Sequence, residues 1–368
     1  MAELKMAEKS IILSILVITH NQRELLKRCL DSVLMQKLNV PFEVIVSDDR
    51  SDDGTAEYMA TLIQLWKDGE LAVANLIEIV YTRCNSDDCD PKNVSERCGW
   101  NKLNAYQHAR GEYFVNVDAD DYLKSNDIYQ AQLDMLAAHP ECSMCMQDVW
   151  EINDGEALDK GVRWFAGANM PYGEVLSPQE IITKYRALNQ CYMIHRHPDD
   201  DMMQLYGKHF DDTIITQHHL QFGPCVYLDR ADYVWVRYDN SITKSMNKDE
   251  DAVIYGLLPL HHIRLIPAFA SEFMKQGVPE LIRSLKILSR NRYRWTLSES
   301  TMCGFREAPG RVYRVFSDNN STFLKRIYLC YVRMVILIYK YFGFTNWCYL
   351  YGLLVSLEAS RKISWRKI

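Results

Sequence analysis

Three short polar clusters each follow an apolar, β-branched run of the sequence. The clusters are Thr19-His20-Asn21, Asp48-Asp49 and Asp118-Ala119-Asp120-Asp121. Ligands of open α/β sheets bind outside the carboxyl ends of the strands, so we expect the clusters to converge on one crevice. Carboxylates packed together raise one another's pKa unless a cation lies between them. The pattern therefore predicts Mn²⁺ or Mg²⁺ bound with a diphosphate, although each cluster alone could consist of loop residues and helix N-caps.

The runs between these clusters indicate the elements that position them. Buried strands are predicted at 14–18, 42–46, 76–81 and 113–117, and helices at 24–36, 55–66 and 99–109. Strands that alternate with helices favour a right-handed, doubly wound, parallel sheet.

The order after residue 125 is read from shorter signals. We predict helices at 128–138 and 211–222 and strands at 143–151, 191–195, 225–228 and 233–238. Residues 250–300 are predicted to form helices, and the polar stretch 304–321 a hinge. The run Asp199-Asp200-Asp201 is predicted to be a solvated turn or a helix start, with contacts to the acceptor as the alternative. The neighbours His218 and His219 are expected to point in different directions on their helix.

Composition excludes several classes of protein. The 368 residues are 48% hydrophobic and 24% charged, which is ordinary for a folded globular protein. A net charge of −6 gives no overall attraction to nucleic acid. The 11 cysteines accompany a charged N-terminal segment that is unlike a secretory signal, so we expect reduced thiols in a cytoplasmic protein.

The order SILVITHN, VIVSDDRSDDGT and ARGEYFVNVDADDYL resembles the family 2 glycosyltransferases. The resemblance is continuous over residues 12–140 and extends more weakly to about 245. It implies the GT-A fold, an α/β fold with a Rossmann-like, mixed but mostly parallel sheet flanked by helices. It also implies a GT-A domain at 1–245, with a nucleotide-binding half at 11–125 and an acceptor half at 126–245. A helical C-terminal region would follow at 246–368.

The resemblance also implies roles for the three clusters. The loop Thr19-His20-Asn21 would pass against the nucleotide base and ribose, and Asp49 or Asp48 would accept a hydrogen bond from the base. Asp118 and Asp120 would form the DXD pair around Ala119, with Asp118 near the ribose and Asp120 on the metal. The arginine that many relatives carry in the preceding helix is replaced here by Asn104, with Lys102 nearby.

The downstream part of the resemblance concerns the reaction. An acidic residue that opens a late helix acts as the base in this family. Asp212 aligns best with it, and its neighbour Asp211 is the alternative. Arg237 would face the diphosphate, and Asp239 would substitute for a missing histidine as a metal ligand.

These features predict an inverting glycosyltransferase of the hexosyltransferase type. It would transfer a sugar from a nucleotide-diphosphate donor, first of all a UDP-sugar, to a saccharide or lipid-linked saccharide acceptor in cell-surface polysaccharide biosynthesis. A catalytically inactive nucleotide-sugar-binding or scaffold protein is the main alternative. A sugar nucleotidyltransferase is a second one, but the glycine-rich basic loop of those enzymes is missing after residue 19.

The C-terminal tail differs from the rest of the chain in charge. Residues 319–368 contain eight Lys and Arg and one Glu, so the tail carries +7 and the remainder −13. Many aromatic side chains accompany these cations. The combination predicts peripheral contact of residues 325–368 with an anionic membrane, at the cytoplasmic face of the inner membrane. Packing on the catalytic domain and a homodimer interface are the alternatives.

Overall fold

A computed structural model describes residues 10–84, 94–166, 170, 172–185, 188–200, 202, 213–239, 266–269 and 272. The chain divides into two compact units, Met1–Ser241 and Ile242–Ile368. The second unit contributes the short 3₁₀ helix η4 (Pro267–Phe269) to the described residues. None of the described helices is long and apolar enough to cross a membrane.

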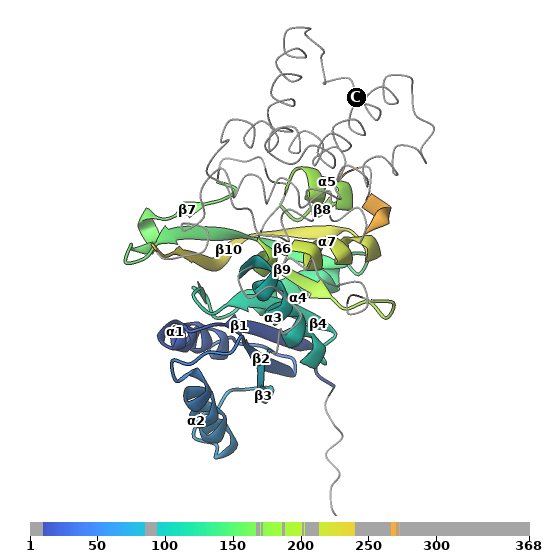
Figure 1. The fold of residues 1–368 in the computed structure, drawn as a ribbon. Helices are drawn as coiled ribbons and strands as arrows, with labels where there is room; N and C mark the ends of the chain where they lie inside the picture. The colour runs from blue at the N-terminus through green and yellow to red at the C-terminus, as the bar shows by residue number, and fades with distance from the viewer. Residues whose placement is uncertain are drawn as a thin grey trace, which may run out of the picture. The chain divides into compact units, whose positions relative to one another are not determined.

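The first unit is built on one ten-stranded sheet (Figure 1). The strands are β1 (Leu13–Thr19), β2 (Phe42–Asp48), β3 (Leu76–Arg83), β4 (Tyr113–Asp118), β5 (Tyr122–Leu123), β6 (Met144–Asn153), β7 (Val162–Arg163), β8 (Val175–Leu176), β9 (Tyr192–His195) and β10 (Cys225–Arg237). The helices are α1 (Arg23–Leu34), α2 (Thr55–Lys67), α3 (Val94–His108), α4 (Ile128–Ala138), α5 (Pro178–Thr183) and α7 (Thr213–His219). Three further 3₁₀ helices are η1 (Leu158–Lys160), η2 (Asn189–Cys191) and η3 (Leu220–Phe222).

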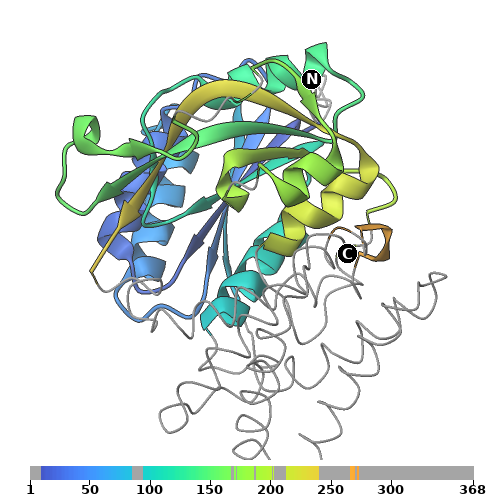
Figure 2. The same cartoon turned by 90° about the horizontal axis from the view of Figure 1, so that it is seen from above.

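The sheet is mixed but mostly parallel. Its strand order is β3-β2-β1-β4-β9-β6-β10-β5, with β9 antiparallel to both of its neighbours. The helices α1 and α3 lie on opposite sides of the strands, which Figure 2 shows from above. The predicted fold class is therefore confirmed.

Burial explains why the first strands form a parallel sheet. All seven residues of β1 and all seven of β2 are buried, as expected for strands covered on both faces. The buried residues of α1 are Leu26, Cys29, Leu30 and Val33, a spacing that places them on one face of the helix against the sheet.

The prediction of two strands at 225–228 and 233–238 was wrong. A single 13-residue strand, β10, pairs with β6 throughout, with register shifts between Leu228 and Ala231 and between Ala231 and Tyr233. The polar stretch Asp229-Arg230 looks like a turn in the sequence. In the structure it forms part of a bulge, which absorbs the extra residues while the strand continues.

Candidate active site

The polar clusters at the ends of β1, β2 and β4 lie side by side. Thr19 is paired with Asp48 in the β1–β2 register, and Ile18 is paired with Asp118 in the β1–β4 register. Because the three strands are parallel, their carboxyl ends share one edge of the sheet. The predicted convergence is therefore present in the structure.

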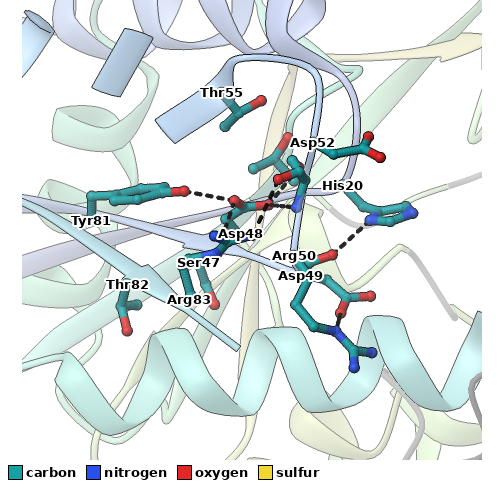
Figure 3. Close-up of polar contacts among 12 residues, drawn as sticks. His20, Ser47, Asp48, Asp49, Arg50, Asp52, Thr55, Tyr81, Thr82 and Arg83 are labelled. Carbon is teal, nitrogen blue, oxygen red and sulfur yellow. Dashed lines mark hydrogen bonds and ion pairs between the residues drawn. The ribbon is translucent and has the colours of Figure 1, made fainter. Parts of the chain in front are cut away.

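Both carboxylate oxygens of Asp48 are hydrogen-bonded, one within its own loop and one to β3 (Figure 3). One carboxylate oxygen accepts hydrogen bonds from the main-chain N–H and the hydroxyl of Ser51, at 3.0 and 2.5 Å. The other accepts from the hydroxyl of Tyr81 at 2.6 Å. Asp48 is also completely buried. This carboxylate shapes the loop after β2.

Asp49 lies among cations instead. Arg97 of α3 donates from Nε to Asp49 Oδ2 at 2.8 Å and places a second nitrogen at 2.5 Å from the same oxygen. Arg50 approaches Oδ1 at 3.3 Å. The ring of His20 donates from Nδ1 to the carbonyl of Asp49 at 2.7 Å, as drawn in Figure 3. His20, Asp49 and Arg97 thus form one group beside the end of β1.

Arg97 was not among the predicted site residues. Asn104 was expected to stand where relatives carry an arginine. In the structure Asn104 donates to the hydroxyl of Ser47 at 2.7 Å and so connects α3 to β2. Arg97 lies two helical turns earlier and 48 residues from its partner Asp49, so local spacing gives no signal for the pair.

The loop after β4 contains three carboxylates in different surroundings. Asp118 is 28% exposed, lies 3.3 Å from the buried ammonium of Lys102 and accepts a hydrogen bond from Gln190. Asp121 is buried and accepts from the hydroxyl of Tyr233 at 2.6 Å and from the N–H of Val236 at 2.9 Å. It therefore fastens the loop to β10.

Asp120 lies between these two residues in the chain. Burial, reinforced by the charge of Asp118, raises the pKa of Asp120 to about 6. Its carbonyl accepts hydrogen bonds from Arg28 of α1 at 2.5 Å and from the hydroxyl of Tyr238 at 3.4 Å. Ala119 is buried and donates its N–H to the carbonyl of Ile18. Main-chain contacts thus fix the loop. Burial and the charge of Asp118 disfavour the ionised form of the Asp120 carboxylate.

A divalent cation fits this donor set. Asp118 and Asp120 offer hard carboxylate oxygens, and a bound cation would relieve the repulsion that raises the pKa of Asp120. Within the described ranges, no group of three His, Cys, Asp or Glu side chains could hold a metal. Further ligands would come from a diphosphate, from water or from residues outside these ranges. Asp239 is exposed, beside Tyr238.

Arg237 stands at the end of β10. Its guanidinium donates to Glu151 Oε1 at 2.6 Å and lies 5.4 Å from the centre of the Trp235 ring. The two residues predicted to act as the base, Asp211 and Asp212, lie outside the described residues, directly before α7.

The expectations that Asp200 is solvated and that His218 and His219 point in different directions were wrong. A helix start was the alternative for this run, and the N–H of the helical residue Met202 does donate to Asp200 Oδ1, at 2.9 Å. Asp200 is buried, and both histidines contact its carboxylate, His218 Nε2 at 2.9 Å and His219 Nε2 at 3.3 Å. The hydroxyl of Tyr106 donates to the same group. Burial alone would raise the pKa of Asp200, but the hydrogen bonds from the histidines outweigh it and hold the pKa well below its usual value. Neither the turn composition nor the helical spacing could reveal a partner brought in from another element.

Comparison with known proteins agrees with this geometry. The model of glycosyl transferase family 2 matches residues 14–77, from β1 to the start of β3. The chain has the same fold as the crystal structure of S. aureus TarS 1–349 in complex with UDP-GlcNAc. The TM-score is 0.51 at 17% identity, over 83% of each chain. A second TarS 1–349 structure gives a TM-score of 0.50 at 15% identity, over 97% of this chain and 93% of that one.

A sequence relative is the uncharacterized protein Rv1520 of Mycobacterium tuberculosis, 31% identical over 151 residues. The match covers 40% of this chain and 38% of the relative, so the chain spans well under half the length of the curated relatives it matches. The chain thus has a GT-A fold, and its residues 14–77 match the model of glycosyl transferase family 2.

Proposed function

We propose that this chain is an inverting glycosyltransferase that moves a sugar from a nucleotide-diphosphate donor to an acceptor hydroxyl. The observation that carries the proposal is the convergence of His20, Asp49 and Asp118 at adjacent carboxyl ends of parallel strands. UDP-sugars are the first donors to test, since TarS, which shares the fold, was solved with UDP-GlcNAc. The acceptor would be a saccharide or a lipid-linked saccharide of a cell-surface polysaccharide.

The base of the nucleotide would lie against the group formed by His20, Asp49 and Arg97. Both oxygens of Asp48 accept short hydrogen bonds, whereas Oδ1 of Asp49 is approached only by the exposed Arg50, at 3.3 Å, which favours Asp49 as the acceptor of the hydrogen bond from the base. Arg97 would hold that carboxylate in place.

The diphosphate would lie near Asp118 and Asp120, which would hold Mn²⁺ or Mg²⁺. Such an ion supplies charge stabilisation to a departing diphosphate. Lys102 already places a positive charge 3.3 Å from Asp118.

Asp212, with Asp211 as its neighbour, would remove the proton of the acceptor hydroxyl. The hydroxyl oxygen then attacks the anomeric carbon, and the bond to the nucleoside diphosphate breaks with its electron pair on the phosphate oxygen. The described start of α7 at Thr213 supports this assignment, because its Thr216 is hydrogen-bonded to η2, which in turn contacts Asp118. A positioned base contributes about 10²–10⁴ in rate.

The test is sugar transfer and donor hydrolysis from a panel of nucleotide sugars, with and without Mn²⁺. We expect Asp120→Ala to abolish metal-dependent donor binding, and Asp212→Asn to keep donor affinity and lose transfer. Normal transfer by Asp212→Asn together with loss in Asp211→Asn would move the base by one residue. Donor binding without turnover by the parent protein would favour the inactive binding protein, and nucleotidyl transfer would favour the sugar nucleotidyltransferase.

A further inference from the structure

The helix η2 connects two parts of the proposed site. Asn189 accepts a hydrogen bond at Oδ1 from the hydroxyl of Thr216 of α7, at 2.8 Å. The next residue, Gln190, donates from Nε2 to the carboxylate of Asp118 at the end of β4. Both side chains are about 95% buried, at 4% and 5% exposure. One end of the Asn189 amide is therefore bonded to α7, and one end of the Gln190 amide is bonded to Asp118.

The other end of each amide has no partner. Asn189 Nδ2 and Gln190 Oε1 are buried without a hydrogen bond, as is Oε1 of Gln217, which follows Thr216 on α7. Asn116, two residues before Asp118 on the same face of β4, lacks partners for both of its amide atoms. Buried polar atoms are rarely left unpaired, because each costs about 1–3 kcal/mol. Unsatisfied amides thus lie on η2 and on two of the elements that it contacts, α7 and β4.

The chemistry of these atoms selects the kind of group that would satisfy them. Asn189 Nδ2 is a donor, whereas the two glutamine oxygens are acceptors. A diphosphate offers only acceptors and cannot pair with either oxygen. A hydroxyl both donates and accepts, so a group carrying several hydroxyls satisfies all three atoms.

We propose that Asn189, Gln190 and Gln217 bind hydroxyl groups of the transferred sugar and determine which sugar is accepted. The inference rests on the proposed function, which places the donor diphosphate beside Asp118. The two faces of the subsite come from η2 and α7, and the Thr216–Asn189 hydrogen bond holds them together. A sugar lacking the matching hydroxyl leaves a buried amide unpaired, which is the strongest way for a site to reject an analogue.

The experiment compares nucleotide sugars with the free nucleotides. Dissociation constants of UDP, GDP, UDP-glucose, UDP-galactose, UDP-N-acetylglucosamine and GDP-mannose are measured by calorimetry in Mn²⁺ for the full chain. The variants are Gln217→Met, which leaves the Asp118 contact intact, and Gln190→Met. We expect the Kd of the preferred nucleotide sugar to rise about tenfold in each, with the Kd of the free nucleotide within twofold of the parent for Gln217→Met.

Gln147→Met is the matched control. Gln147 of β6 is a buried glutamine with an unpaired Nε2, and its Oε1 accepts a hydrogen bond from the main-chain N–H of Asp232 on β10. It should change no dissociation constant, and thermal melting of each variant verifies folding.

Two results would overturn the inference while leaving the proposed function standing. Unchanged affinities in Gln190→Met and Gln217→Met would mean that internal water satisfies the amides. Equal weakening of nucleotide and nucleotide sugar by Gln217→Met would mean that this amide only maintains the fold. A parent protein that binds none of the six ligands overturns the proposed function itself.

Discussion

Adjacent acidic residues have different roles in the candidate site because their hydrogen-bond partners differ. Asp48 and Asp49 are neighbours, yet Asp48 is bonded to Ser51 of its loop and Tyr81 of β3, and Asp49 to Arg97. Likewise Asp121 binds β10, while Asp120 keeps a carboxylate whose pKa is raised to about 6. The sequence predicts that these acidic residues lie at the strand ends. It does not predict which carboxylates are hydrogen-bonded within the protein, because their partners Tyr81, Arg97 and Tyr233 come from distant segments.

Arg97→Met tests the pairing of Asp49 at the residue scale. The change leaves a buried carboxylate without its charge-assisted hydrogen bonds, each of which contributes about 1.5–3 kcal/mol. We expect the Kd of UDP to rise about tenfold, measured by calorimetry. Arg50→Met is the control, since Arg50 is more exposed and approaches Asp49 only at 3.3 Å. Equal effects of the two substitutions would contradict a specific role for Arg97.

The buried histidine pair predicts how stability depends on pH. Burial lowers the pKa of His219, so below its ordinary value of about 6.5 the unfolded chain binds a proton that the folded chain does not. Stability then falls as the pH decreases, by at most about 1.4 kcal/mol per pH unit for one group. Asp200, whose pKa is lowered, adds stability above about pH 4 that is lost only at more acidic pH.

The surroundings of His219 are Asp200, His218 and the rings of Tyr106 and Phe114. We expect His219→Gln to flatten the fall of the unfolding free energy between pH 6.5 and 5, measured by urea denaturation. His108→Gln, on the exposed side of α3, should keep the slope of the parent. A slope unchanged in His219→Gln would show that His219 takes up its proton in the folded state.

At the scale of elements, continuous apolar runs and helical spacing were sufficient for most of residues 12–140. The predicted strands at 42–46 and 113–117 lie within β2 and β4, and the predicted helix at 128–138 coincides with α4. The failure at β10 has a physical cause, since a bulge requires the same polar residues as a turn and only pairing with β6 distinguishes the two. Boundaries were less accurate at α3, which begins at Val94 instead of residue 99.

The ARGEY motif before β4 joins three elements. Arg110 donates to the buried Glu43 of β2 through its N–H and guanidinium, and Gly111 donates to the hydroxyl of Ser14 of β1. A Cβ on Gly111 would lie 2.7 Å from both the nitrogen and the hydroxyl of Ser14. This close approach explains the glycine without any role in chemistry.

Gly111→Ala tests that packing. The added methyl must displace the backbone of β1 or β4, and overpacking of this kind costs about 1–3 kcal/mol. We expect a loss of that size in the unfolding free energy, measured with urea. Gly69→Ala is the comparison, because open space surrounds Gly69 and only its φ of +77° opposes a side chain, at about 1 kcal/mol. A smaller loss for Gly111→Ala than for Gly69→Ala would contradict the steric explanation.

At the scale of the whole molecule, charge is distributed unevenly along the chain. The basic residues at 319–368 and the predicted base at Asp212 lie outside the described residues, so their roles remain proposals from the sequence. A glycosyltransferase that uses a lipid-linked acceptor must bring its site to a membrane surface. A basic, aromatic tail on an acidic body is suited to that task, because anionic lipids attract the tail and repel the body.

Neutralising the tail tests this role in the full chain. Each Lys or Arg near an anionic leaflet contributes about 1 kcal/mol, so changing Arg361, Lys362, Arg366 and Lys367 to Gln should weaken binding to phosphatidylserine vesicles about a thousandfold. The measurement is flotation with vesicles of increasing anionic content. The matched control changes four exposed cations of the first unit, Lys27, Lys37, Lys67 and Lys160, and should float like the parent. If the parent does not float, or if both quadruple variants float equally well, the tail packs on protein, either on its own catalytic domain or in a homodimer.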